Sequence, residues 1–204
     1  MKNYKLEEKL NKYILNPRSA RANFDLGNEY YDLKQYASAI SYYLRCAELS
    51  DNDDLVYESL LYSWVCMHDV KGRVVFEKGQ IEQTIAQSPH RPEAYFIICS
   101  WLEDHGEGSY NSKEELFHQM YVYACIGIHN NMNNKVFKKF DKYPGLQGLL
   151  FYKAFAGWQI GKITEAEDIF VDLYNNHNLS VEYREYVLNN IKNLGIEYRI
   201  NENE

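Results

Sequence analysis

The chain has 204 residues, of which 46% are hydrophobic and 25% are charged, so it can bury a sizeable core and is not a disordered tail. Its net charge of -7 argues against non-specific binding to nucleic acid, and it lacks the run of about 18 apolar residues that a membrane-spanning helix needs. Only 4 residues are proline, which favours a mostly helical chain.

The four cysteines are widely spaced and form no CxxC pair, so the sequence indicates neither a zinc site nor a redox dithiol. Cys46, Cys66, Cys99 and Cys125 each lie in an apolar segment, where cysteine behaves as a small hydrophobic residue. The N-terminal segment is charged and has no apolar signal-peptide core. We therefore expect free thiols in a reducing compartment and a cytoplasmic protein.

Apolar residues at four-residue spacing predict a first helix over residues 3–15. Leu6, Leu10 and Ile14 form its apolar stripe, and Pro17 ends it. We assign residues 1–17 to this N-terminal helix.

Residues 20–53 are predicted to form two helices that carry small and large residues at characteristic positions. The small ones allow the helices to approach closely, and the large ones fill the space between them. These residues are Leu26, Gly27, Tyr30, Ala39, Tyr43 and Cys46. The pattern resembles the tetratricopeptide repeat, a helical hairpin of about 34 residues, and residues 20–53 hold one such unit. Because one hairpin cannot bury its apolar faces alone, more hairpins are expected to follow.

Three weaker units keep a similar spacing, over residues 54–91, 92–129 and 145–178. Residues 130–144 are polar, contain a basic stretch, and are predicted to form an inserted loop. Residues 180–195 are predicted to form a capping helix with a polar outer face, as repeat arrays require at their ends.

Local signals mark several helix ends. The acidic loop 51–54 is typical of a helix N-terminus, and Ser112 with Glu115 has capping-box spacing. Thr164 with Glu167 has the same spacing and predicts another cap. Gly195 is predicted to end the last helix.

Short runs elsewhere are similar to helical repeat regions that accompany glycosyltransferase domains in viral and bacterial proteins. They are residues 88–96, 121–128, 143–145, 151–154 and 158–162. The chain itself shows no alternation of strands and helices that would bind a nucleotide sugar, and Asp51-Asn52-Asp53 lies between repeats, where we interpret it as a helix cap. The resemblance therefore implies an accessory domain rather than the transferase.

No common catalytic or metal-binding motif is present in the sequence, so we expect no enzyme activity, no cofactor and no metal. An enzyme remains a third hypothesis, which a pocket uniting Arg91, Glu103 and His105 would favour.

The resemblance to tetratricopeptide repeats implies a groove lined by the first helix of each hairpin. Carried onto this chain, the groove residues are Arg21, Phe24, Asn28, Tyr31, Glu58, Tyr62, Glu93, Phe96, Ser100 and Trp158. Phe24 replaces the lysine of repeats that clamp chaperone C-termini, so a chaperone tail is not the expected ligand. Packing between repeats is the alternative role for the aromatic residues in this set.

The sequence thus predicts an all-α solenoid of about four hairpins with flanking helices. The predicted function is a non-catalytic scaffold that binds a protein or peptide in the groove. The alternative is an accessory domain of a glycan-synthesis system whose partner is a glycosyltransferase.

Overall fold

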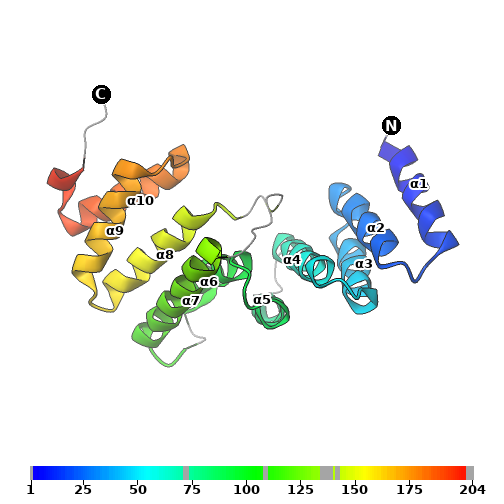
Figure 1. The fold of residues 1–204 in the computed structure, drawn as a ribbon, viewed down its shortest axis with the longest axis horizontal. Coiled ribbons are helices and arrows are strands. Elements are labelled where there is room, and N and C mark those ends of the chain that lie inside the picture. Colours follow the sequence, from blue (N-terminus) through cyan, green and yellow to red (C-terminus); the bar gives the residue numbers. More distant parts are fainter. Residues whose placement is uncertain (1, 71–73, 108–109, 134–139, 141–142, 201–204) are drawn as a thin grey trace. The chain divides into compact units, whose positions relative to one another are not determined.

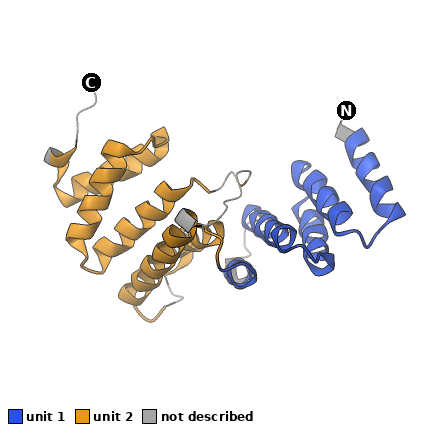
Figure 2. Ribbon diagram, viewed as in Figure 1, with its two compact units in different colours: residues 1–89 blue, residues 90–204 orange. Residues whose placement is uncertain are grey.

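The computed structural model describes residues 2–70, 74–107, 110–133, 140 and 143–200. Within these residues the chain is all-α and contains no strand, which confirms the predicted fold class. It forms two compact units, residues 1–89 and 90–204 (Figure 2). Each unit is a series of helices in which neighbours along the chain pack together (Figure 1). The assignment of repeat boundaries and of one continuous domain stays a prediction.

The described residues of the first unit form five helices. They are α1 (Lys2–Leu15), α2 (Ala20–Asp32), α3 (Tyr36–Leu49), α4 (Asp53–Asp69) and α5 (Val74–Gln87). Contacts between α2 and α3 and between α3 and α4 are the most extensive. The helices predicted from periodicity in this unit therefore form in the expected order.

Where the structure describes the second unit, it forms five α-helices and a short 3-10 turn. They are α6 (Glu93–His105), α7 (Lys113–Asn133), α8 (Leu146–Gln159), α9 (Ile163–Asn176), α10 (Val181–Leu194) and η1 (Glu197–Arg199). Helix α8 packs on α7, α9 and α6, which places it at the centre of this unit.

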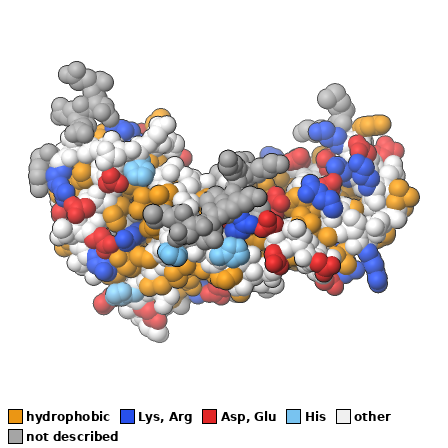
Figure 3. All heavy atoms as spheres, in the orientation of Figure 1, with side chains coloured by type: hydrophobic (Ala, Val, Ile, Leu, Met, Phe, Trp, Pro, Cys, Tyr) orange, Lys and Arg blue, Asp and Glu red, His pale blue; other side chains and the backbone are white. Residues whose placement is uncertain are grey.

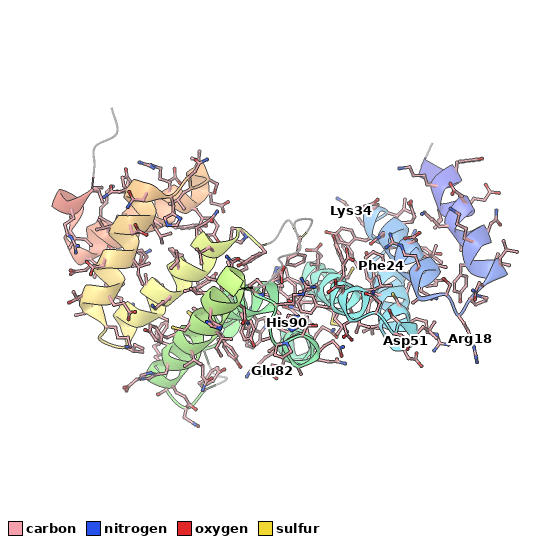
Figure 4. The ribbon with its side chains drawn as sticks, in the orientation of Figure 1. Arg18, Phe24, Lys34, Asp51, Glu82 and His90 are labelled. Carbon is pink, nitrogen blue, oxygen red and sulfur yellow. The ribbon has the colours of Figure 1, made fainter. Side chains whose placement is uncertain are left out.

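Two hairpins, one in each unit, share the same turn. In α2–α3, Lys34 (labelled in Figure 4) has a φ of 59°, and the next residue, Gln35, donates its N–H to the carbonyl of Tyr30 at 2.9 Å. In α8–α9, Gly161 has a φ of 82°, and Lys162 donates to the carbonyl of Gly157 at 2.8 Å. The matching turns indicate that both hairpins are built on one plan.

Two features of the sequence give the helices of the first hairpin their close approach. Gly27 presents no Cβ to Tyr43, whose Cδ1 would lie only 2.8 Å from one. The hydroxyl of Tyr43 then donates a 2.7 Å hydrogen bond to Oδ1 of Asn28. Tyr43 and Ala39 are both fully buried, so this contact lies in the core of the unit.

The predicted helix ends are partly confirmed. Asn52 caps α4 by accepting the N–H of Leu55 at 2.8 Å, and Gly195 ends α10 in the left-handed region with a φ of 70°. Ser112 accepts the N–H of Glu115 at 3.1 Å, so α7 begins as expected.

Two expectations about helix ends are wrong. The capping box at Thr164 and Glu167 does not form, because the backbone turn at Gly161 already starts α9 at Ile163, with no side-chain cap. Residues 130–133, predicted as part of a loop, belong to α7. Asn130 is buried, and Asn131 accepts a 2.6 Å hydrogen bond from the Tyr143 hydroxyl, so these polar residues extend the helix. The basic stretch of the predicted loop lies outside the described residues.

Candidate functional site

The predicted groove residues of the first unit gather on α2 and α4. Phe24 (labelled in Figure 4) is only 3% exposed, and its ring centroid lies 5.6 Å from that of Tyr43 and 6.1 Å from that of Tyr62. Tyr31 and Tyr62 are half-buried, with ring centroids 6.3 Å apart. These aromatic residues therefore contact one another as part of the packing of the unit.

The polar members of this set lie beside that aromatic cluster. Arg21 is exposed, with its guanidinium carbon 5.4 Å from the Phe24 ring centroid and its Nε 2.9 Å from the Asp25 carboxylate. Asn28 holds the Tyr43 hydroxyl, and Glu58 is half-buried.

A small pocket in this unit lies between α1 and the start of α2, and it is lined by several basic residues. Those residues already have acidic partners. Lys9 lies 3.1 Å from Asp25, which Arg21 also contacts, and Lys12 lies 2.7 Å from Glu8. Figure 3 shows the resulting mixture of basic and acidic side chains over α1 and α2. We therefore do not consider this pocket an anion site.

The second unit contains a larger pocket of about 350 Å³, formed by α6, α8 and α10. Its lining residues are Phe96, Ser100, Glu103, Asp104, Phe151, Tyr152, Glu182, Tyr183 and Tyr186. A volume of this size is within the range of small-ligand sites, which is about 300–1,000 Å³. Five of the nine lining residues are aromatic, and the exposed lining is more polar than apolar.

The aromatic walls are held by ring–ring contacts between the three helices. The Phe96 and Tyr152 centroids are 5.5 Å apart, and Phe151 lies 6.1 Å from Tyr183 and 6.4 Å from Tyr186. Edge-to-face and tilted arrangements at these separations are favourable for aromatic pairs. The wall is thus fixed by packing, while Tyr186 at its edge keeps 49% of its surface exposed.

One glycine of α8 allows this wall to close. A Cβ on Gly148 would lie 2.7 Å from Cε2 of Phe96 and 2.5 Å from Cγ of Pro144. The absence of a side chain there allows Phe96 to lie against the backbone of α8. Phe96 is consequently only 7% exposed although it lines the pocket.

The polar side of the pocket contains three carboxylates. Glu103 accepts a 3.0 Å hydrogen bond from the Tyr152 hydroxyl, and Glu182 accepts a long one, 3.5 Å, from Tyr186. Asp104 follows Glu103 on α6. The pocket therefore combines ring surfaces with negative charge.

Glu103 retains solvent exposure, but the protein atoms around its carboxyl group raise its pKa. The hydrogen bond from Tyr152 opposes this rise, and the charge of Asp104 adds to it. Burial also raises the pKa of the Tyr152 and Tyr183 hydroxyls, and the negative charge of Glu103 raises both further. Both tyrosines thus stay protonated and able to donate a hydrogen bond.

The predicted groove residues of the second unit have different positions. Phe96 and Ser100 line the pocket, whereas Glu93 is fully buried and Trp158 is half-buried outside the lining. Neither Arg91 nor His105 lines the pocket that contains Glu103, so the arrangement that would favour an enzyme is not present there. His105 stacks on Trp101 instead, with ring centroids 5.7 Å apart.

The contribution of α10 to the pocket is absent from the predicted set. Tyr183 and Tyr186 belong to the predicted capping helix, yet both rings contact Phe151 at the pocket. Their spacing of three residues on one helix, next to Glu182, is the sequence signal that could have identified this face.

Two other kinds of feature are absent from the described residues. No described helix is both long and apolar enough to cross a membrane. No group of three or more His, Cys, Asp or Glu side chains in the described part of the chain is arranged to hold a metal ion.

Comparison with known proteins identifies one family. The family model named "Tetratricopeptide repeat" matches residues 20–53, the segment that forms α2, α3 and their flanking turns. No curated protein matches the sequence. These comparisons give no support to the predicted association with glycosyltransferases. Proteins with tetratricopeptide repeats generally bind other proteins and are typically not catalytic. Because the match and the hairpin geometry agree on the same residues, the chain contains a tetratricopeptide repeat.

Proposed function

We propose that this chain is a non-catalytic scaffold that binds a protein or peptide segment in the pocket of α6, α8 and α10. The observation that supports this most strongly is the open aromatic wall formed by these three helices. In the repeat pattern, α6 and α8 are first helices of hairpins, and this is the position from which tetratricopeptide repeats present their groove.

Aromatic side chains at the edge of a pocket are well suited to anchor a partner. Tyrosine offers a large apolar surface and a polar hydroxyl at low cost in conformational entropy, and such residues dominate binding energy at interfaces. Tyr186 fits this role because it is half-exposed while its ring is held against Phe151 and Tyr183.

In the first unit, we propose Arg21, Asn28, Tyr31, Glu58 and Tyr62 as a second contact surface. Tyr31 and Tyr62 keep part of their surface exposed, which supports this role beside their packing role. Phe24 is too deeply buried to contact a partner directly and is proposed to support that surface from below.

We also propose a cytoplasmic location. The four cysteines are free thiols, and Cys46, Cys66 and Cys99 are buried. Free thiols are typical of proteins in a reducing compartment.

The binding proposal is tested by selecting random linear peptides against the full chain and measuring their affinity for a Tyr186→Ala variant. We expect the substitution to weaken the selected peptides at least about tenfold, because truncating an anchor costs about 2 kcal/mol or more. The fold should persist because Tyr186 is half-exposed.

Tyr4→Ala provides a matched control, because Tyr4 is 75% exposed on α1 in the other unit. It should leave the affinity unchanged. The proposal is wrong if no peptide is selected, or if the selected peptides bind Tyr186→Ala as strongly as the unaltered chain.

A further inference from the structure

The charged residues that line the pocket of α6, α8 and α10 are all acidic. Glu103 and Asp104 come from α6 and Glu182 comes from α10, so two helices supply carboxylates to one cavity. None of the lining residues is Lys, Arg or His.

Several carboxylates elsewhere in this unit have cationic partners. Glu165 lies 2.7 Å from Nζ of Lys153, and Asp168 lies 2.6 Å from a guanidinium nitrogen of Arg199. In the part of the chain that the structure describes, none of the three pocket carboxylates forms such an ion pair. Glu103 and Glu182 instead accept hydrogen bonds from tyrosine hydroxyls. The pocket therefore holds negative charge that the described cations do not neutralise.

Arg184, the basic residue of α10 closest to Glu182 in sequence, contacts another partner. The guanidinium carbon of Arg184 lies 4.0 Å from the ring centroid of Tyr174, on α9. This contact leaves the charge of Glu182 available to a ligand.

The aromatic wall is complementary to the same kind of ligand. The face of a tyrosine or phenylalanine ring attracts a cation within about 6 Å of its centroid. Ring faces and carboxylates lining one cavity thus both favour a positive charge. A guanidinium satisfies both best, because it is planar, stacks on rings and donates two parallel hydrogen bonds to a carboxylate.

We propose that this pocket binds the cationic side chain of a partner's peptide segment, with arginine preferred over lysine. The inference rests on the proposed peptide-binding function and names the residue that the pocket recognises. Glu103 and Glu182 pair with the cation, and Tyr183 and Tyr186 cover it with their rings.

The experiment is a titration of the full chain, followed by backbone amide NMR, with N-acetylarginine methylamide and its lysine and norleucine counterparts. We expect saturable shifts at Tyr183 and Tyr186 with the arginine probe, weaker binding of the lysine probe, and none with norleucine, which has no charge. Glu103→Gln and Glu182→Gln should each weaken the arginine probe about tenfold, since a charged hydrogen bond is lost. Each change is isosteric and keeps an acceptor for the tyrosine hydroxyl.

Glu185→Gln is the matched control. It makes the same change of charge on the same helix, but Glu185 is exposed and does not line the pocket. It should change the affinity of the probe far less than Glu103→Gln does. Circular dichroism of each variant confirms that the fold is retained.

The outcomes separate this inference from the proposed function. Equal binding of norleucine and arginine, or equal effects of Glu103→Gln and Glu185→Gln, would overturn the cation inference while leaving a peptide site in place. Absence of saturable shifts with every probe also overturns it. Failure of the random-peptide selection overturns the proposed function itself.

Discussion

At the scale of single residues, the first hairpin depends on a glycine that faces a tyrosine. Gly27 and Tyr43 come from different helices, and the ring of Tyr43 occupies the space that a Cβ on residue 27 would need. The tyrosine is fully buried and its hydroxyl is already bonded to Asn28, so it cannot easily move away. The position of the Tyr43 ring therefore requires a glycine at residue 27.

We expect Gly27→Ala to destabilise the chain by about 1–3 kcal/mol, the usual cost of overpacking a core. The matched control is Gly79→Ala in α5, where no atom lies within 4 Å of the position that the new methyl group would take. That change should be neutral or stabilising by up to about 1 kcal/mol, because alanine favours helix over glycine. Urea unfolding of both variants gives the comparison. Equal stability of the two would show that the close approach of Tyr43 to Gly27 is not a constraint.

At the scale of helices, α3 lies between α2 and α4 and contacts both extensively. Its buried face includes Ala39, Tyr43 and Cys46, at spacings of four and three residues. Ala39 is fully buried, whereas Ala37, two positions earlier, is exposed. The two alanines thus report on opposite faces of one helix.

We expect Ala39→Glu to unfold the first hairpin, because a carboxylate would be buried without a partner. Ala37→Glu should change the melting temperature little, since the new charge points into water. Circular dichroism and thermal melting measure both. An Ala39→Glu variant that melts with the unaltered chain would contradict the packing of α3 between its neighbours.

Which helices form could be read from the sequence because the signals are local. Four-residue periodicity, the cap at Asn52 and the stop at Gly195 each act within one or two turns of helix. The failed cap at Thr164 shows the limit of such signals. A side-chain motif matched the pattern, but the backbone turn at Gly161 had already fixed where α9 begins.

The candidate pocket was only half predictable, because its members are far apart in sequence. Phe96 and Ser100 followed from the repeat pattern, which places first-helix residues in a groove. Tyr183 and Tyr186 did not, since a capping helix has no place in that pattern and only its packing on α9 turns these rings towards Phe151. Trp158 continues the periodic spacing of α8 but does not line the pocket.

At the scale of the whole molecule, the net charge of -7 acts on any basic partner before contact is made. Long-range attraction between opposite charges raises the rate of association, whereas close contacts in a pocket mainly set the rate of dissociation. The two effects can be separated in this chain, because it offers carboxylates inside and outside the pocket. Glu103 lines it and Glu185 does not.

We therefore expect Glu103→Gln and Glu185→Gln to slow the association of a selected arginine-containing peptide by similar, small amounts, since each removes one negative charge. Of these two variants, only Glu103→Gln should speed dissociation, by about tenfold, because Glu103 pairs with the bound guanidinium and Glu185 does not. Added salt should slow association of the peptide with the unaltered chain and with both variants, since it screens the attraction. Stopped-flow fluorescence with a labelled peptide resolves both rates. If the two variants raise the dissociation rate equally, the pocket carboxylates do not hold the partner. If salt leaves association unchanged, the net charge does not attract it. Both results together would make a neutral apolar segment the better description of the ligand.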